Sequence, residues 1–346
     1  MFSKSIHRRI RRLYLIGAGA SCPYGLPTLK KLTRDLYNFI EGGNRKIFLE
    51  AIYESFGIDL EQSEGSPDFE ELLNRLDPIA LRYVSSETSN DFEIIRKKAA
   101  EIALNGLRDF FLYHCDIMKK IEGPYDHLIC SLASDEAIVS FNWDILIELA
   151  FKRNSRDFSY WDENEKSTVL LKPHGSINWF ALLDRELLSV DLNKNWQIFG
   201  NNLSYYMLFL KDPLGSRDLG KSSPFLKASL ATIPAIVPPM ASKVLSVGGR
   251  PRDGFVQSGH ERTMRKIWNL FRKFIIEATE LIVIGYSLPG TDAASIAILK
   301  QFGRSENKKI IIIDKDQQIL KRYQRLVHPN ATIISDDFKK FKPEKI

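Results

Sequence analysis

The sequence has few cysteines and no long apolar run, and each absence excludes a class of protein. Its 346 residues contain three cysteines, scattered and odd in number, with no CxxC pair, so we expect no disulfide framework. No run of eighteen apolar residues exists, and charged residues occupy the N-terminal stretch where a signal peptide needs its apolar segment. We therefore expect a cytoplasmic protein without a membrane segment.

Internal repeats and low-complexity tracts are also missing, and the composition is that of a folded globular protein. Hydrophobic residues make up 44% and charged residues 27% of the chain, whose length permits one domain with large insertions or two domains. The net charge of +6 and a basic cluster within residues 8–12 permit attraction to a polyanion. A short basic arm is usually solvated, and no nucleic-acid-binding module accompanies it, so we do not expect direct binding of nucleic acid.

The N-terminal third combines a strand, a glycine-rich loop and a set of helices. An apolar run at 13–16 ends in glycine, which predicts a buried strand, a loop over 17–25 and a helix over about 28–40. From about 41 to 123 the apolar residues follow helical spacing, as at Phe69, Leu72, Leu73 and Leu76. This segment predicts a helical insertion.

The remaining pattern predicts an α/β fold with a Rossmann-like, doubly wound parallel sheet. Apolar strands that alternate with helices, and that are apolar on both faces, are typical of a parallel sheet covered on both sides. The core domain is expected to comprise 10–40, 124–176 and 235–346, with a second, irregular insertion over 177–234. The expected strands after the first are 137–141, 169–171, 281–284, 310–313 and 331–335, and the expected helices are 144–151, one around 267–275, 293–301 and 317–326.

The glycine-rich loop is the first candidate site. Glycines at Gly17 and Gly19 allow backbone N–H groups, including those of Ala18 and Ser21, to approach a pyrophosphate closely. The dinucleotide fingerprint GxGxxG is incomplete because Cys22 occupies the position of its third glycine. A purely structural turn between strand and helix remains an alternative.

Polar residues follow two further strands at the edge where a doubly wound sheet binds its ligand. Asn142 offers a neutral donor and acceptor for a ribose hydroxyl or a water, whereas Asp144 could bind a ligand or simply cap the next helix. His174 follows the strand 169–171 and could accept a proton near neutral pH, although a histidine in a loop is often structural.

Two C-terminal strands also end in candidate residues. The segment from Gly285 to Leu288, Gly-Tyr-Ser-Leu, follows the strand 281–284 and contains Ser287. Asp314 follows the strand 310–313, where an acidic residue suits the hydroxyls of an adenosine ribose. A solvated acid in a turn is the alternative for Asp314.

Taken in order, these segments resemble the sirtuin-like (silent information regulator) superfamily over about residues 13–320. Residues 17–21 with the Gly-Leu-Pro that follows look like that family's GAG-S…G-P loop, and 141–144 look like its Q-N-I-D segment. His174 with its following glycine looks like the catalytic His-Gly, and 285–288 look like G-T-S-L. One departure matters: residues 177–283 contain no cysteine, whereas deacylating sirtuins carry a four-cysteine zinc ribbon in that interval. The forms that the four motifs take in this sequence are similar instead to those of the bacterial anti-phage branch of the superfamily, whose members deplete NAD.

This resemblance implies an NAD+ glycohydrolase that needs no metal, releases nicotinamide and ADP-ribose, and acts in defence. It implies that His174 is the base, that Asn142 orients water or sugar, and that a partner such as an ATPase or an Argonaute-like protein, or homo-oligomerisation, restrains the enzyme. An NAD-dependent deacylase, an ADP-ribosyltransferase and a non-catalytic NAD or ADP-ribose sensor are the alternatives. The implied cofactor-binding residues are Gly17, Ala18, Gly19, Ser21, Asp144, Gly285, Ser287 and Asp314.

Overall fold

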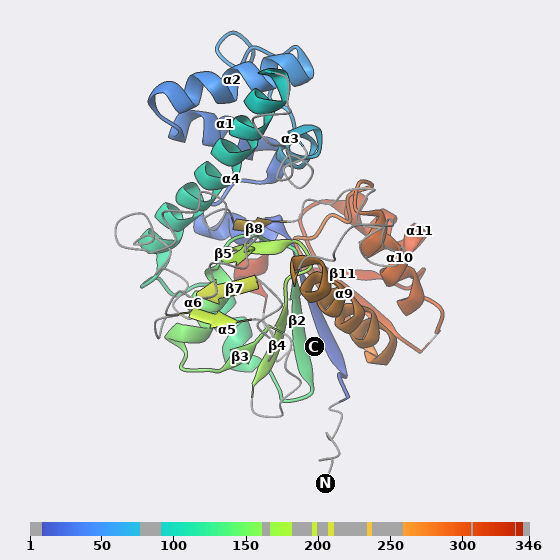
Figure 1. Cartoon of the computed structure of the whole chain (residues 1–346). Coiled ribbons are helices and arrows are strands. Elements are labelled where there is room, and N and C mark those ends of the chain that lie inside the picture. Colours follow the sequence, from blue (N-terminus) through green and yellow to red (C-terminus); the bar gives the residue numbers. More distant parts are fainter. Residues whose placement is uncertain are drawn as a thin grey trace.

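A parallel sheet forms the centre of the protein, with strand order β11-β10-β9-β1-β2-β4-β3 (Figure 1). This arrangement confirms the predicted Rossmann-like α/β fold. The computed structural model describes residues 9–76, 91–160, 167–181, 196–198, 207–210, 234–236, 259–305, 307–335 and 337–341. The strands of this sheet are β1 (Arg12–Ile16), β2 (Glu136–Ser140), β3 (Phe158–Ser159), β4 (Thr168–Leu171), β9 (Glu280–Ile284), β10 (Lys309–Ile313) and β11 (Thr332–Ser335).

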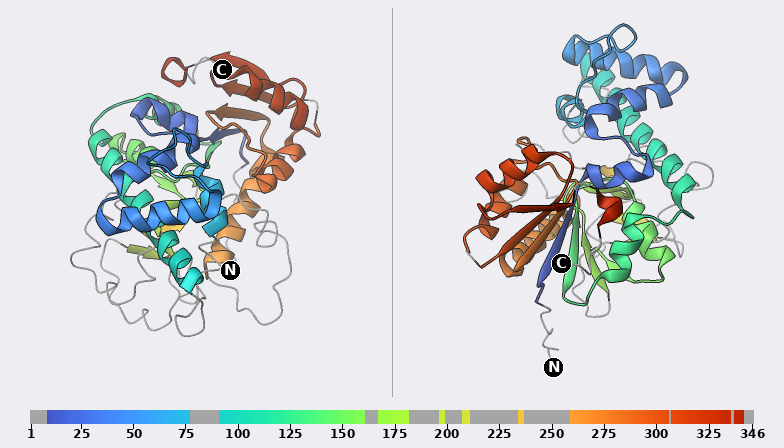
Figure 2. Two further views of the ribbon diagram at one scale, coloured as in Figure 1. Left: turned by 90° about the horizontal axis from the view of Figure 1, so that it is seen from above. Right: turned by 180° about the vertical axis from the view of Figure 1, so that it is seen from behind.

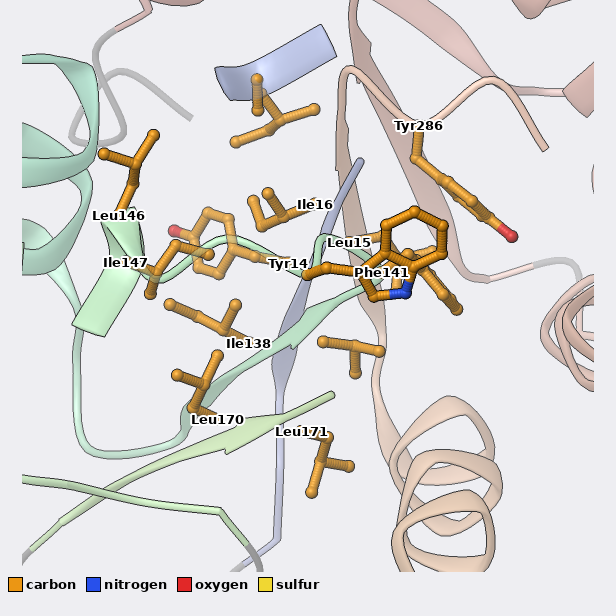
Figure 3. Packing of buried hydrophobic residues seen from close by; sticks show 14 of the residues in the cluster. Tyr14, Leu15, Ile16, Ile138, Phe141, Leu146, Ile147, Leu170, Leu171 and Tyr286 are labelled. Atoms are coloured by element: carbon orange, nitrogen blue, oxygen red, sulfur yellow. The ribbon is translucent and has the colours of Figure 1, made fainter. Parts of the chain in front are cut away.

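β1 lies in the middle of the sheet, and all five of its residues are buried. It pairs in parallel with β2 on one side and with β9 on the other, so that Leu13 lies opposite both Ala137 and Leu281. Residues from β1, β2 and β4 pack together in Figure 3. Continuous apolar burial of this kind is what a parallel sheet with two covered faces requires.

Helices cover both faces of the sheet. α5 (Pro124–Ser131) packs against α6 (Leu146–Arg153) on one face, and α9 (Gly259–Glu277) packs against α10 (Ala293–Phe302) on the other (Figure 1). α11 (Gln317–Leu326) joins β10 to β11. None of the helices in the described ranges is long and apolar enough to cross a membrane.

A lobe of helices projects from the carboxyl edge of the sheet, and the right-hand view of Figure 2 shows it apart from the strands. The helical lobe contains α1 (Leu29–Phe39), α2 (Gly42–Phe56), α3 (Phe69–Leu76) and α4 (Asp91–Met118). α1 contacts the other three helices, so it belongs with the segment 41–123 rather than with the sheet. An amphipathic stripe predicts that a helix buries one face, but it does not say against which neighbour.

A small second sheet occupies part of the segment 177–234, and the prediction of a wholly irregular insertion is wrong there. Its strands have the order β6-β7-β5-β8 and pair antiparallel. Three of them have three or four residues, too few to give a readable alternation in the sequence. The strands are β5 (Gly175–Ala181), β6 (Trp196–Ile198), β7 (Met207–Leu210) and β8 (Pro234–Ile236).

Candidate active site

One cavity of about 700 Å3 collects every residue that the sequence singled out for a site. The cavity lies at the carboxyl ends of the central strands, beside β1, from which the chain continues to β2 on one side and, later, to β9 on the other. Such a reversal of strand order is where open α/β sheets bind ligands. The predicted residues that line it are Gly17, Ala18, Gly19, Ser21, Asn142, Asp144, His174, Gly285, Ser287 and Asp314.

The loops after β1 and β9 touch each other through glycines. A Cβ on Gly17 would lie 2.5 Å from the carbonyl oxygen of Gly285, and a Cβ on Gly19 would lie 2.9 Å from the Cα of Gly285. Gly285 itself has φ +60 and would place a Cβ 2.3 Å from the backbone nitrogen of Ala20. The glycines are therefore required for contact between two loops, a role that the sequence pattern did not indicate.

The same contact occupies two of the N–H groups that were expected to hold a pyrophosphate. The N–H of Gly17 donates to the carbonyl of Ile284 and that of Gly19 donates to the carbonyl of Gly285, each over 3.0 Å. Residues 18–24, predicted as a loop, form a 3₁₀ helix whose first residue is Ala18. Because the first N–H groups of a helix have no partner within it, the N–H of Ala18 is the donor best suited to a phosphate.

The side-chain amide of Asn142 is held by two hydrogen bonds. Its Nδ2 donates to the carbonyl of Gly17 over 3.0 Å and to Oγ of Ser21 over 2.9 Å. Both N–H bonds of the amide are thereby used, so its carbonyl oxygen is the atom that remains to accept from a ligand or a water. The side chain is 7% exposed and lines the cavity.

Ser21 connects Asn142 to a buried carboxylate. Its hydroxyl donates to Oδ2 of Asp144 over 2.8 Å and lies 3.1 Å from the hydroxyl of Tyr125. Oδ1 of Asp144 accepts from the N–H of Leu146, so Asp144 also acts at the start of α6, as one of the two sequence interpretations proposed. Burial raises the pKa of Asp144, and the charge of Lys172 opposes that rise. Ser21 and Asp144 thus form the support that fixes Asn142.

Lys172 joins the loop after β2 to the loop after β4. Its ammonium donates to Oε1 of Glu148 over 2.8 Å, to the backbone carbonyl of Asp144 over 2.6 Å and to Oγ of Ser176 over 2.7 Å. The side chains of Lys172 and Glu148 are both fully buried. Three charge-assisted bonds from one cation hold the segments that contain Asn142 and His174 at a fixed separation.

His174 packs against one of two stacked aromatic rings, those of Phe141 and Tyr286. Its ring meets that of Phe141 edge to face with 5.0 Å between centroids, and Phe141 stacks on Tyr286 with 4.1 Å between centroids and 11° between the ring planes. The indole N–H of Trp143 donates to the backbone carbonyl of His174 over 3.1 Å. Nε2 of His174 lies 3.0 Å from Oδ2 of Asp292, a residue that the sequence analysis did not select. The only sequence signal for Asp292 was its position directly before the helix 293–302.

Ser287 and Asp314 also line the cavity. Arg322 in α11 donates to the backbone carbonyl of Ser287 over 2.7 Å and fixes this turn, in which Leu288 adopts φ +51. A non-glycine residue in the left-handed region is typical of functional loops. Burial raises the pKa of Asp314, which accepts from the N–H of Asp316 and is not a purely solvated acid.

The helical lobe also contributes to the cavity wall, through residues of α3 that the sequence analysis did not assign to a site. Phe69 in α3 packs edge to face against Trp143, with 6.0 Å between ring centroids. This contact brings the polar start of α3 over the cavity. The lobe residues that line it on this side are Asp68, Glu70, Glu71 and Asn74.

Among the residues that the structure describes, no group of three or more histidine, cysteine, aspartate or glutamate side chains is arranged to hold a metal ion. Comparisons with known proteins add little. No family model and no curated protein matches the sequence. Among solved structures, a Sir2 complex with an inhibitor, 2'-O-acetyl-ADP-ribose and a deacetylated peptide covers 96% of this chain and 91% of its own, at 14% identity and a TM-score of 0.42. Sir2Tm bound to a propionylated peptide covers 95% and 88%, at 11% identity and a TM-score of 0.40. At these scores, nothing about activity follows.

Proposed function

We propose that this chain binds NAD+ in the cavity and hydrolyses the bond between nicotinamide and ribose, releasing nicotinamide and ADP-ribose. The observation that carries the proposal is the convergence of Asn142 and His174 on one cavity at the reversal of strand order. Its volume of about 700 Å3 lies within the range of cofactor sites. The role that the sequence motifs imply therefore has room for its substrate.

The arrangement of Asn142 supports a role in orienting the attacking water. Its two N–H groups are fixed by Gly17 and Ser21, which leaves its carbonyl oxygen as the atom that would accept a hydrogen bond from the water. A neutral acceptor can align water or a ribose hydroxyl without adding charge at the sugar, where positive charge develops as nicotinamide leaves. His174 accepts the proton that the water loses.

The remaining residues would position the two ends of the dinucleotide. The N–H of Ala18 would contact the pyrophosphate, while Ser287 and Asp314 would bind the adenosine half. Asp144 and Gly285, together with Gly17, Gly19 and Ser21, would act by shaping and supporting the cavity, through the loop contacts and hydrogen bonds described above.

In the cell, we propose that the activity depletes NAD during phage infection and that homo-oligomerisation or a separately encoded partner, such as an ATPase or an Argonaute-like protein, restrains it. Uncontrolled hydrolysis would kill the host, which is the reason to expect restraint. This part of the proposal rests on the motif resemblance. It is tested by expressing the chain with the products of neighbouring genes and measuring cellular NAD during infection.

The biochemical test is mass spectrometry of NAD+ incubated with the purified protein, alone and with those gene products. We expect nicotinamide and ADP-ribose from the wild type, and loss of both with Asn142→Ala and with His174→Ala. Asn44→Ala and His127→Ala, at exposed positions outside the cavity, are matched controls. Retention of full activity by both cavity variants would refute the assignment, and turnover of acyl-lysine peptide would indicate deacylation instead.

A further inference from the structure

His174 and Asp292 form a buried pair although they are 118 positions apart in the sequence. His174 follows β4, and Asp292 is the N-cap residue of α10. Nε2 of the imidazole lies 3.0 Å from Oδ2 of the carboxylate, and the two side chains are 2% and 1% exposed. Burial protects a hydrogen bond between such groups from competition with water.

Asp292 is surrounded by donors. Besides His174, its Oδ2 accepts from the hydroxyls of Tyr286 and Ser295, each over 2.7 Å, and its Oδ1 accepts from the N–H of Ser295. Burial and the adjacent carboxylate raise the pKa of Tyr286 well above its ordinary value, so this phenol stays a donor. Several donors and the N-terminus of α10 stabilise the ionised form of the carboxylate.

An ionised carboxylate can only accept hydrogen bonds, so the imidazole that faces it must carry its hydrogen on Nε2. Nδ1 is then the ring nitrogen that has the lone pair. We infer that Asp292 is the positioning residue of the site: it fixes the tautomer and the ring orientation of His174 so that Nδ1 accepts the proton. The inference rests on the proposed NAD+ hydrolysis.

The proton and electron balance of the step is simple. The C–N bond between ribose and nicotinamide breaks, and its electron pair leaves with nicotinamide. The water oxygen forms a bond to the same ribose carbon and loses a proton to Nδ1 of His174. The imidazolium so formed is stabilised by the carboxylate of Asp292 and then releases the proton to solvent.

Asp292→Asn is the decisive variant, because asparagine caps a helix as well as aspartate does and α10 should remain intact. The new amide can donate to Nε2 and thereby move the imidazole hydrogen to Nδ1. We expect kcat to fall by roughly 10⁴-fold, as when a histidine-orienting carboxylate is lost in a hydrolase, while KM changes by less than about threefold. Asp292→Ser, which also keeps a capping side chain, should show the same loss.

Nitrogen NMR of protein that carries isotope-labelled histidine gives a readout independent of turnover. Among the six histidines, the His174 signal is assigned as the one that disappears in His174→Gln. We expect the Nε2–H tautomer in the wild type and a different tautomer, or a mixture, in Asp292→Asn. Asp337→Asn is the matched control, because Asp337 caps a short 3₁₀ helix by accepting from the N–H of Lys339 and does not line the cavity.

The two readouts separate failure of this inference from failure of the proposed function. If the wild type cleaves NAD+ and Asp292→Asn changes neither kcat nor the tautomer, Asp292 is not the positioning residue. A wild type that shows the predicted tautomer but no cleavage under any condition would refute the hydrolase assignment and leave the pairing in place. A fall in kcat without a change of tautomer would also overturn the inference.

Discussion

Nδ2 of Asn142 lies 2.9 Å from the hydroxyl oxygen of Ser21, although 121 positions separate the two residues in the sequence. This bond gives a serine in a glycine-rich loop a supporting role in the site, because it holds the amide of Asn142 in place. The hydroxyl of Ser21 donates to Asp144 and accepts from Asn142, so the amide can present only its carbonyl oxygen.

Ser21→Ala should therefore weaken NAD+ hydrolysis by releasing Asn142. Displacement of a catalytic group by about 1 Å costs on the order of 10²-fold in rate, and we expect kcat to fall by about that factor. Steady-state assay of nicotinamide release measures the effect. Ser131→Ala, which removes a hydroxyl that bonds to the carbonyl of Leu128 in α5, is the control and should leave kcat unchanged. Equal activity of the two variants would contradict the role given to Ser21.

Gly17→Ala should destabilise the fold, because the new Cβ would lie 2.5 Å from the carbonyl oxygen of Gly285. Relieving that overlap requires the two loops to separate, and overpacking of this kind costs about 1–3 kcal/mol. The free energy of unfolding, measured in urea, should fall by this amount. Gly43→Ala has no atom within 4 Å of its new Cβ and should not lower stability. A stable Gly17→Ala would show that the loops do not meet as described.

Lys172→Met should be one of the most damaging single changes in the sheet domain. It leaves Glu148 buried without its cation, which costs about 3–5 kcal/mol, whereas replacing both residues by methionine should recover most of the loss. A double-mutant cycle in urea measures the coupling. Lys119→Met, which breaks a surface pair with Asp116, should cost less than about 1 kcal/mol. Additive effects of Lys172→Met and Glu148→Met would argue against the pair.

Alkaline pH should destabilise the protein through its buried tyrosines. Burial raises the pKa of Tyr125 and of Tyr323 well above the ordinary value of 10.0, so the folded state keeps protons that the unfolded chain releases. The free energy of unfolding should consequently be insensitive to these groups below about pH 10 and fall above it. Urea unfolding between about pH 8 and pH 11, with phenolate absorbance, measures this.

Tyr125→Phe should make the alkaline fall in stability shallower, since it removes one of the protons that the folded state retains. Tyr53→Phe is the matched control, because Tyr53 is 56% exposed and the change removes a phenol without altering the buried core. Identical slopes for the two variants would contradict the buried environment of Tyr125.

Local sequence patterns predicted most strands of the sheet and part of the cavity lining, although they missed β3 and the residues that the helical lobe contributes. The apolar runs at 13–16 and 281–284 predicted strands that the structure contains with one added residue at the start of each, and the helix 317–326 begins and ends as predicted. Polar residues directly after parallel strands must gather at one edge. Asn142 and His174 therefore could be placed at the same cavity without coordinates.

The sequence by itself determined which segments become buried strands, because burial on two faces demands continuous apolar runs that can be counted along the chain. Only the tertiary structure decided which distant groups meet: Asp292 with His174, Ser21 with Asn142, and the glycine loop with Gly285. It also decided that α1 packs in the helical lobe. The three contacts of the site join residues separated by more than a hundred positions, and no local period in the sequence records a pairing of that range.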